Sequence, residues 1–422
     1  MSVLSRGALL PVLPALLLGA AGLQGQLPQA GAAGLGLGAN MTASARGFAA
    51  VANNPAGLAH WATPGFSLAI PSLSLGSGTG PVTLGDLADW EGARIPREVR
   101  EAWLTAIAAD GGQSLTVDAS ATPVALNVGP VGFQLSTVAG GTADLSPDAA
   151  ELLLFGNAGR TGEARDLALE GSTVDGYVLT TAALSLGARA SDRVYLGVTG
   201  KYTMGNALLM GRDGGSLAST DPLEVALDFP VVVNRSRDTR LNNGTGVGLD
   251  LGILWEGPGF TLGARVENVV NTFSWDLDGL AWVPGQALFD GTDATSDFAQ
   301  RPAESAPPEV RAAVDDLTLE PVYSLGVAWE LPHLRVQADV RRRSDGGMAL
   351  GPEYHAGVGA ELTAVPFLPL RAHLAAVSGG AQLGGGATLV LGALNLSAGG
   401  AYRTVGPENA LLGMVTLSFG GW

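Results

Sequence analysis

The sequence predicts an all-β protein: a transmembrane antiparallel β-barrel of about 14 strands with long extracellular loops. Three observations lead to this prediction. The chain begins with an export signal, its apolar residues alternate with small or polar ones in short segments, and the connections between these segments alternate between short and long.

Composition excludes several classes of protein. The 422 residues include 39 acidic and 23 basic side chains, a net charge of −16, which argues against a nucleic-acid partner. Hydrophobic residues make up 46% of the chain despite 62 Gly and 24 Pro, so the chain is not a disordered polar polymer. The absence of Cys excludes disulfides, thiolate metal sites and cysteine nucleophiles.

Residues 1–25 have the three regions of a secretory signal peptide. Residues 1–6 carry one positive charge, residues 8–18 are apolar, and residues 19–25 are rich in small side chains. The alternative is a membrane anchor, but the apolar run is about half of the ~20 residues that a spanning helix needs. We therefore expect residues 1–25 to be cleaved.

The first predicted elements are strands with two unlike faces. Between residues 246 and 255, one face carries Leu251, Ile253 and Trp255, and the other carries Asp250 and Gly252. The same pattern predicts strands over 65–75, 115–126, 131–138, 173–189, 194–204, 244–256, 260–270, 318–330, 334–342, 353–362, 367–376, 382–391, 394–402 and 411–419.

The connections favour a membrane barrel over a secreted soluble sandwich or propeller. Short connections such as 127–130, 191–193, 257–259 and 331–333 alternate with long ones such as 76–114, 139–172, 205–243 and 271–317. Short turns at one rim and long loops at the other are typical of outer-membrane barrels. A propeller would show a blade repeat, and the sequence has none. A secreted soluble β protein remains the alternative.

The faces of the predicted strands fit a lipid-exposed exterior and a polar lumen. Leu251 is expected to face lipid, while Gly252 faces the lumen and is expected to accept serine. Charged residues fall mostly on the lumen face, with these six as the principal candidates: Lys201, Asp250, Arg265, Arg335, Asp339 and Arg371. Aromatic residues gather near strand ends, where interfacial girdles form.

A segment before the first strand has features of a buried turn. Its core is Asn53, Asn54, Pro55, Ala56, Gly57 and Leu58. Pro55 lacks a backbone donor, the two asparagines favour turns, and Gly57 permits a positive φ. The alternative is an ordinary linker between the signal and the barrel.

This Asn-Pro-Ala-Gly-Leu segment resembles the N-terminal segment of the FadL-like family of long-chain fatty-acid outer-membrane transporters, and related PorV-type barrels share it. The resemblance implies a fourteen-stranded barrel over 64–422, a lumen hatch or plug over 26–63, and a place in the cell outer membrane of a diderm bacterium. It also implies uptake of hydrophobic, fatty-acid-like small molecules through a plugged lumen. No ligand-contacting residue of the family can be matched, so no substrate transfers.

The long loops hold the candidate ligand-binding residues. Residues 96–109 are predicted to form a helix with Val99, Ala102, Trp103, Ala106 and Ile107 on one side. The other loops carry further aromatic residues, and the candidates are Trp103, Ile107, Phe155, Phe273, Trp275 and Trp282. These side chains either pack loop on loop or form an apolar ligand site.

No pattern indicates an enzyme or a cofactor. His355 and His373 lie on adjacent predicted strands near Glu361, which suits hydrated lumen histidines or a metal or proton site. Residues 34–38 lack the context of a dinucleotide loop, and no Gly-x-Ser-x-Gly elbow occurs, which leaves a barrel phospholipase as the enzyme alternative.

The expected partners are outer-membrane lipid and a hydrophobic small molecule, with no nucleic acid. The competing function is a secretion-associated scaffold of the PorV type that binds protein partners through its extracellular loops.

Overall fold

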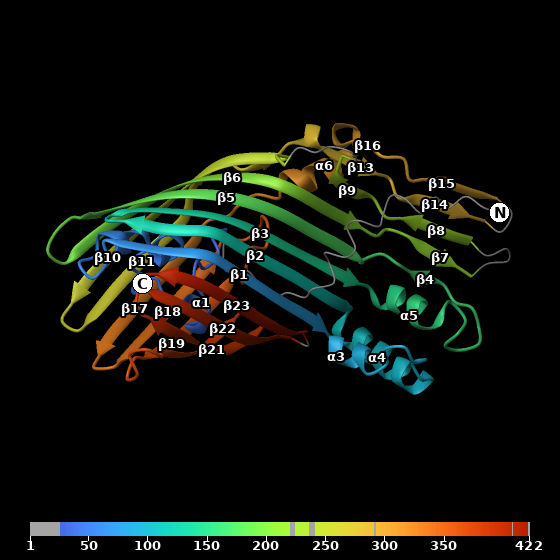
Figure 1. Ribbon diagram of the computed structural model, residues 1–422. Helices are drawn as coiled ribbons and strands as arrows, with labels where there is room; N and C mark the ends of the chain where they lie inside the picture. Colours follow the sequence, from blue (N-terminus) through green and yellow to red (C-terminus); the bar gives the residue numbers. More distant parts are fainter. Residues whose placement is uncertain (1–25, 220–223, 236–240, 291–292, 407, 421–422) are drawn as a thin grey trace.

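The computed structural model describes residues 26–219, 224–235, 241–290, 293–406 and 408–420, so the predicted signal peptide lies outside the described residues. Fourteen long antiparallel strands form one closed barrel, and the last strand pairs with the first (Figure 1). The strands are β1 (Phe66–Gly80), β2 (Gln113–Val128), β3 (Val131–Leu145), β5 (Thr173–Arg189), β6 (Val194–Arg212), β10 (Gly244–Gly257), β11 (Phe260–Asn271), β17 (Val322–Leu331), β18 (Leu334–Arg343), β19 (Tyr354–Leu362), β20 (Leu370–Val377), β21 (Gly380–Leu391), β22 (Leu394–Val405) and β23 (Glu408–Phe419).

Each of the fourteen predicted segments coincides with one of these strands, so the predicted fold class is confirmed. Several strands are longer than expected at their loop ends. β5 and β6 stay paired out to Thr173 and Arg212, whereas the alternation in the sequence ends near residue 204. Backbone hydrogen bonds between β5 and β6 continue beyond residue 204, although the sequence there no longer alternates between apolar and polar residues.

Every connection at the end of the barrel where β1 begins is short, and we call this the turn end; the long connections all lie at the opposite end, which we call the loop end. The predicted strict alternation is wrong for the last strands. The β20–β21 connection is only residues 378–379, and the β22–β23 connection only 406–407. The tall loops therefore rise from β1 to β19, and the wall from β20 to β23 has none.

The long loops fold into small elements of their own beyond the loop end (Figure 1). The helices are α3 (Leu84–Ala88), α4 (Arg97–Asp110), α5 (Pro147–Phe155) and α6 (Pro308–Asp315), with 3-10 turns η3 (Leu277–Gly279) and η4 (Ala303–Ser305). A separate five-stranded sheet contains β4 (Leu167–Ala168), β7 (Ser216–Ala218), β8 (Glu224–Asp228), β14 (Gln286–Phe289) and β15 (Ala294–Asp297). Four short strands extend the barrel sheet: β9 (Val231–Asn234), β12 (Ser274–Trp275), β13 (Leu280–Val283) and β16 (Arg301–Pro302).

The outer surface of the barrel is apolar and its interior is polar. On β10, Val247, Leu251 and Ile253 point outward and are 53%, 45% and 43% exposed, while Asp250 between them is fully buried. At the turn end, Trp255 packs edge-on against Phe260, with 5.5 Å between ring centroids. Closure with this polarity satisfies every strand edge and presents hydrocarbon to a lipid phase.

No helix in the described part of the chain is long and apolar enough to span a membrane.

Candidate functional site

Residues 26–60 lie inside the barrel, and we call residues 26–63 the hatch segment. It contains α1 (Ala32–Gly36), α2 (Ala49–Asn53) and the 3-10 helix η2 (Pro55–Ala59). All of residues 26–60 are buried except Gln29, Gly31 and Ala59, which are partly buried. α1 contacts β21 and β22 on one side of the lumen, and η2 contacts β5 and β6 on the other, so the segment crosses the barrel.

Asn54 organises the core of the hatch segment. It is fully buried, and its side-chain oxygen caps η2 by accepting from Ala56 N at 3.1 Å. Its amide donates to the carbonyls of Thr42, Ile253 and Ala264 at 2.8, 3.2 and 3.3 Å. One asparagine therefore joins two parts of the hatch segment to β10 and β11.

Gly57 is needed for a reason other than the predicted one. Its φ is not among the positive angles of the described glycines. A Cβ on this residue would instead lie 2.1 Å from Ala45 O, so close backbone approach requires glycine here. Pro55 takes the first position of η2, where its missing N–H costs nothing.

The hatch segment rests on glycines of the barrel wall. Gly187, Gly197 and Gly252 are directly paired across β5, β6 and β10, and they form a floor beneath η2. A Cβ at Gly197 would lie 2.1 Å from Ala56 N, and one at Gly252 would lie 2.1 Å from Asn54 Oδ1. The same close approach recurs around the lumen at Gly132, Gly263, Gly326, Gly357, Gly359, Gly386 and Gly399. We call this set of ten glycines the hatch seat.

The hatch seat contradicts the expectation that serine would be accepted at Gly252. The alternation correctly placed this residue on the lumen face, but the lumen is filled there by Asn54 and Pro55. Any side chain at Gly252 would push the hatch segment away from the wall.

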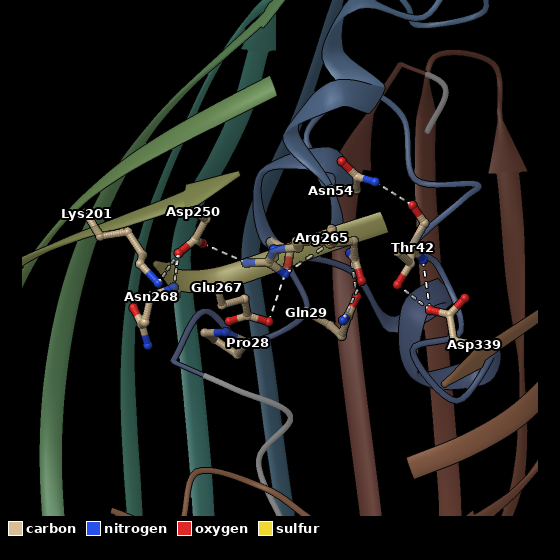
Figure 2. A network of polar contacts seen from close by, with 12 residues as sticks. Pro28, Gln29, Thr42, Asn54, Lys201, Asp250, Arg265, Glu267, Asn268 and Asp339 are labelled. Carbon is tan, nitrogen blue, oxygen red and sulfur yellow. Dashed lines mark hydrogen bonds and ion pairs between the residues drawn. The ribbon is translucent and has the colours of Figure 1, made fainter. Parts of the chain in front are cut away.

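The row formed by Gly187, Gly197 and Gly252 continues into a charged cluster (Figure 2). Gly252 pairs directly with Arg265 of β11, which donates to Asp250 Oδ2 at 2.8 Å and to the carbonyls of Ala52 and Asn53. Those carbonyls end α2, where a cation is favourable. Figure 2 shows the guanidinium lying between the wall and the hatch segment.

The charges in this cluster compensate one another. Lys201 Nζ lies 2.6 Å from Asp250 Oδ1, which also accepts from Asn268 N at 2.9 Å. Arg265 Nη1 lies 3.0 Å from Glu267 Oε1. Two cations and two carboxylates share the cluster, so burial leaves no net charge uncompensated.

A second row of paired residues binds the hatch segment at Thr42. Gly263, Gly326, Asp339 and Gly357 are directly paired across β11, β17, β18 and β19. Asp339 accepts from both Thr42 N and Thr42 Oγ1, at 2.9 and 2.6 Å. Each row therefore combines glycines, which let the backbone approach, with one charged residue that binds it.

The remaining candidate lumen charges and the two histidines also face inward. Glu361 lies 2.7 Å from Arg371 and 3.3 Å from Arg335. His355 Nε2 lies 2.9 Å from Asn40 Oδ1, and His373 Nδ1 lies 3.2 Å from Gly36 O. These histidines pack on the hatch segment instead of facing water, and the described residues hold no group of three metal-binding side chains.

The hatch segment ends in a cluster at the turn end of the barrel. Trp61 Nε1 and Tyr195 OH both donate to Glu256, at 2.9 and 3.0 Å. Burial and the charge of Arg46 lower the pKa of His60 to about 4, so its imidazole is neutral at pH 7. Burial and the nearby Arg335 lower the pKa of Arg46 to about 10, which leaves it charged.

The six candidate ligand-binding residues separate into two clusters at the loop end. Trp103 and Ile107 of α4 pack with Phe155 of α5, and the Arg100 guanidinium lies 4.8 Å from the Phe155 ring centroid. The buried side of α4 carries Leu104 and Ile107, whereas the predicted Ala102 and Ala106 are exposed. The apolar stripe is rotated because α5 covers α4 from a direction that the sequence does not reveal.

The other three candidates belong to a larger cluster in the barrel mouth, which we call the mouth cluster. Its buried members are Val138, Leu179, Leu208, Met210, Val232, Phe273, Trp275, Leu280, Trp282, Ala303, Ala306, Val314, Leu319, Met348 and Leu350. Val138 and Leu179 are inward residues of β3 and β5, so the mouth cluster occupies the lumen beyond the hatch segment. The structure thus brings Phe273, Trp275 and Trp282 together and keeps Trp103, Ile107 and Phe155 apart from them.

Solved structures share this arrangement of strands. The Pseudomonas putida toluene transporter TodX matches with a TM-score of 0.57 at 12% identity, over 93% of this chain and 98% of that one. A Pseudomonas aeruginosa FadL homologue matches with a TM-score of 0.52 at 13% identity, over 94% and 99%. This chain shares their fold. The Ralstonia pickettii toluene transporter TbuX matches with a TM-score of 0.50 at 13% identity, over 92% and 97%. The fold expected from the FadL-like resemblance is therefore confirmed.

No protein-family model matches the chain, and neither does any curated protein sequence.

Sequence reasoning missed the hatch seat, although a signal for it exists. Gly187, Gly197 and Gly252 each occupy an inward position of a predicted strand, where an empty lumen would accept larger polar residues. Glycine in a strand interior often marks close approach of another backbone.

A matched pair of glycines on β6 tests the hatch seat. Gly197→Ala should displace η2, because the new Cβ would overlap Ala56 N, whereas a Cβ at Gly200 on the outward face meets nothing within 4 Å. We expect single-channel recordings in planar bilayers to give a larger ion conductance for Gly197→Ala and a parental conductance for Gly200→Ala. Parental conductance for both variants would show that this contact does not seal the lumen.

Proposed function

We propose that this protein lies in the outer membrane of a diderm bacterium and admits hydrophobic small molecules through its barrel, with the hatch segment as the moving closure. The observation that carries the proposal is the order of layers in the lumen. An apolar mouth cluster lies at the loop end, and a polar layer and the seated hatch segment lie below it.

The mouth cluster suits capture of an apolar molecule. It is built from loop residues and from inward residues of β3, β5 and β6, so one side is loop chain and the other is barrel wall. Apolar surfaces with few polar groups are the usual lining of small-molecule sites. The solved structures with this fold include toluene transporters, which supports the same class of cargo here.

The hatch segment suits a closure that moves. Its contacts with the wall include glycine contacts, apolar packing and side-chain hydrogen bonds, none of which belongs to the ladder between barrel strands. Moving it therefore costs those contacts while leaving the closed barrel intact. The loop end would face outward, and the turn end, where the hatch segment joins β1, would face the periplasm.

A reversible cross-link tests this function. A Cβ at Gly187 would lie 3.0 Å from Ala59 Cβ, near the ~3.8 Å that a disulfide joins. The chain has no Cys, so Ala59→Cys with Gly187→Cys introduces the only thiols. Because Gly187 is part of the hatch seat, the oxidised double variant is compared with its own reduced form: cells producing it should accumulate labelled toluene slowly when oxidised and faster after reduction.

The single variants Ala59→Cys and Gly187→Cys are the controls, because neither can close the bond. If the oxidised double variant takes up toluene at the rate of its reduced form, the hatch segment does not need to move. If no variant exceeds cells lacking the protein, the uptake proposal itself is wrong.

One observation favours the second candidate, a scaffold that binds protein partners. The five-stranded sheet beyond the barrel presents Leu227, Leu288 and Phe289 at 43%, 42% and 42% exposure. A partner protein retained at one-to-one stoichiometry through purification, and lost in Leu288→Ser, would support it.

A further inference from the structure

We propose that the indole N–H of Trp275 recognises an acceptor oxygen on a neutral hydrophobic ligand, so the mouth cluster selects oxygenated molecules over plain hydrocarbons. This inference rests on the proposed function, since it names the class of molecule that the mouth cluster takes.

The polar atoms of the mouth cluster are few. Among its buried side chains, only Trp275 and Trp282 carry a nitrogen or oxygen. Trp282 Nε1 donates to Ser305 Oγ at 3.2 Å. Trp275 is only 6% exposed, and its Nε1 is buried without an acceptor in the described part of the chain.

The unpartnered N–H is held in a fixed place. Trp275 on β12 pairs with Gly244, and its six-membered ring lies against Gly205, where a Cβ would be 2.5 Å from Cζ3. Phe273 packs edge-on against the same indole, with 5.4 Å between centroids and 85° between planes. Because glycine backbone and a second ring lock the indole, it cannot turn to find an acceptor in the protein.

A donor in this state indicates the chemistry of its partner. Buried indole N–H groups usually have an acceptor, and exceptions in native structures call for an explanation such as a bound group. The members of the cluster are uncharged, and the two arginines that contact it are already paired: Arg301, over the Trp282 ring, binds Asp297, and Arg235, which donates to Leu280 O, binds Glu304. Burying a carboxylate in the cluster would be costly without a cation, so the fitting ligand is neutral. A carbonyl, ether or hydroxyl oxygen on an apolar molecule meets both requirements.

One loop supplies the donor and much of the cluster around it. The β11–β17 loop carries Phe273, Trp275 and Trp282, and also α6, whose Val314 is buried in the cluster. The buried members outside this loop come from β3, β5, β6 and β9 and from the β18–β19 loop, which supplies Met348 and Leu350. The donor therefore lies where loop residues meet the barrel wall.

Two probes with the same skeleton separate the hydrogen bond from apolar contact. Acetophenone carries a carbonyl where ethylbenzene carries a methylene. The purified full-length protein in lipid nanodiscs, and empty nanodiscs, are equilibrated with each vapour, and protein-dependent retention is measured by headspace gas chromatography. Trp275→Phe keeps an aromatic ring and removes the N–H.

We expect Trp275→Phe to lower the ratio of retained acetophenone to retained ethylbenzene about 3- to 10-fold, the range for loss of one neutral hydrogen bond. Trp282→Phe is the matched control in the same cluster, and its ratio should stay at the wild-type value because its N–H is already paired with Ser305. An unchanged ratio in Trp275→Phe, or an equal fall in both variants, would overturn the proposal.

Thermal unfolding supplies a second readout. Both variants lose apolar contacts of an indole ring, so Trp275→Phe should lower the unfolding midpoint by no more than Trp282→Phe does, since only the latter loses a hydrogen bond in the protein. A midpoint lowered well below that of Trp282→Phe would reveal a structural partner for the indole and overturn the proposal, as would the absence of protein-dependent retention of either probe. Selective retention without cellular uptake would reject the transport function alone, and uptake without selectivity would reject this inference alone.

Discussion

Replacing Asp250 with alanine is expected to lower the free energy of unfolding by about 3 to 5 kcal/mol, the range for removing one partner from a buried ion pair. Asp250 binds Lys201 and Arg265 simultaneously, and the Lys201 and Asp250 side chains are both fully buried. Without Asp250, two cations would face Glu267 alone. Urea titration of the refolded protein in lipid vesicles, followed by tryptophan fluorescence, measures the change.

An exposed ion pair between β5 and β6 provides the control. Asp175 lies 2.9 Å from Arg212, and both side chains are more than a third exposed. Asp175→Ala should cost about 0 to 1 kcal/mol, because water already solvates both charges. Equal losses in the two variants would mean that water reaches Asp250 and that the charged cluster does not hold the hatch segment.

Leu251→Arg should impair membrane insertion by about 2 to 4 kcal/mol, the cost of a basic residue at the middle of a barrel's lipid face. Leu251 is 45% exposed on the outward face of β10, between Val247 and Trp255. Folding into lipid vesicles, scored by heat-modifiable mobility in gels, measures the effect.

Leu331→Arg controls for the charge itself. Leu331 is also outward and 55% exposed, but it ends β17 beside the turn end, where an arginine costs about 0 to 1 kcal/mol. If both variants inserted equally well, the belt around Leu251 would not be in contact with hydrocarbon. If Leu331→Arg were the worse of the two, our placement of the membrane along the barrel would be shifted.

The sequence predicted the strands well because period-two alternation is a local property. Leu251 and Asp250 reveal their opposite faces within one segment, whatever the rest of the chain does. The two-residue connections at 378–379 and 406–407 were missed for a related reason. An outer loop has no required length, so its absence leaves the neighbouring alternation unchanged.

Contacts between distant segments could not be predicted in the same way. Four complete barrel strands, β1, β2, β3 and β5, separate Ala56 from Gly197 in the chain, and no pattern near either residue points to the other. The same holds for Trp103 and Trp275, which the sequence grouped as loop aromatics and the structure places in different clusters. Residue type indicated that these side chains are buried, but the path of the chain determines which residues they pack against.

The path of the hatch segment also bears on how the protein is assembled. Residues 26–63 are synthesised before any barrel strand, yet α1 packs against β20 to β23, the last four barrel strands, and β1 pairs with β23 to complete the wall. A chain truncated before β23 would leave the hatch segment without its full set of contacts. Correct placement of the hatch segment therefore requires the last four barrel strands, so the lumen is filled only when the barrel is complete.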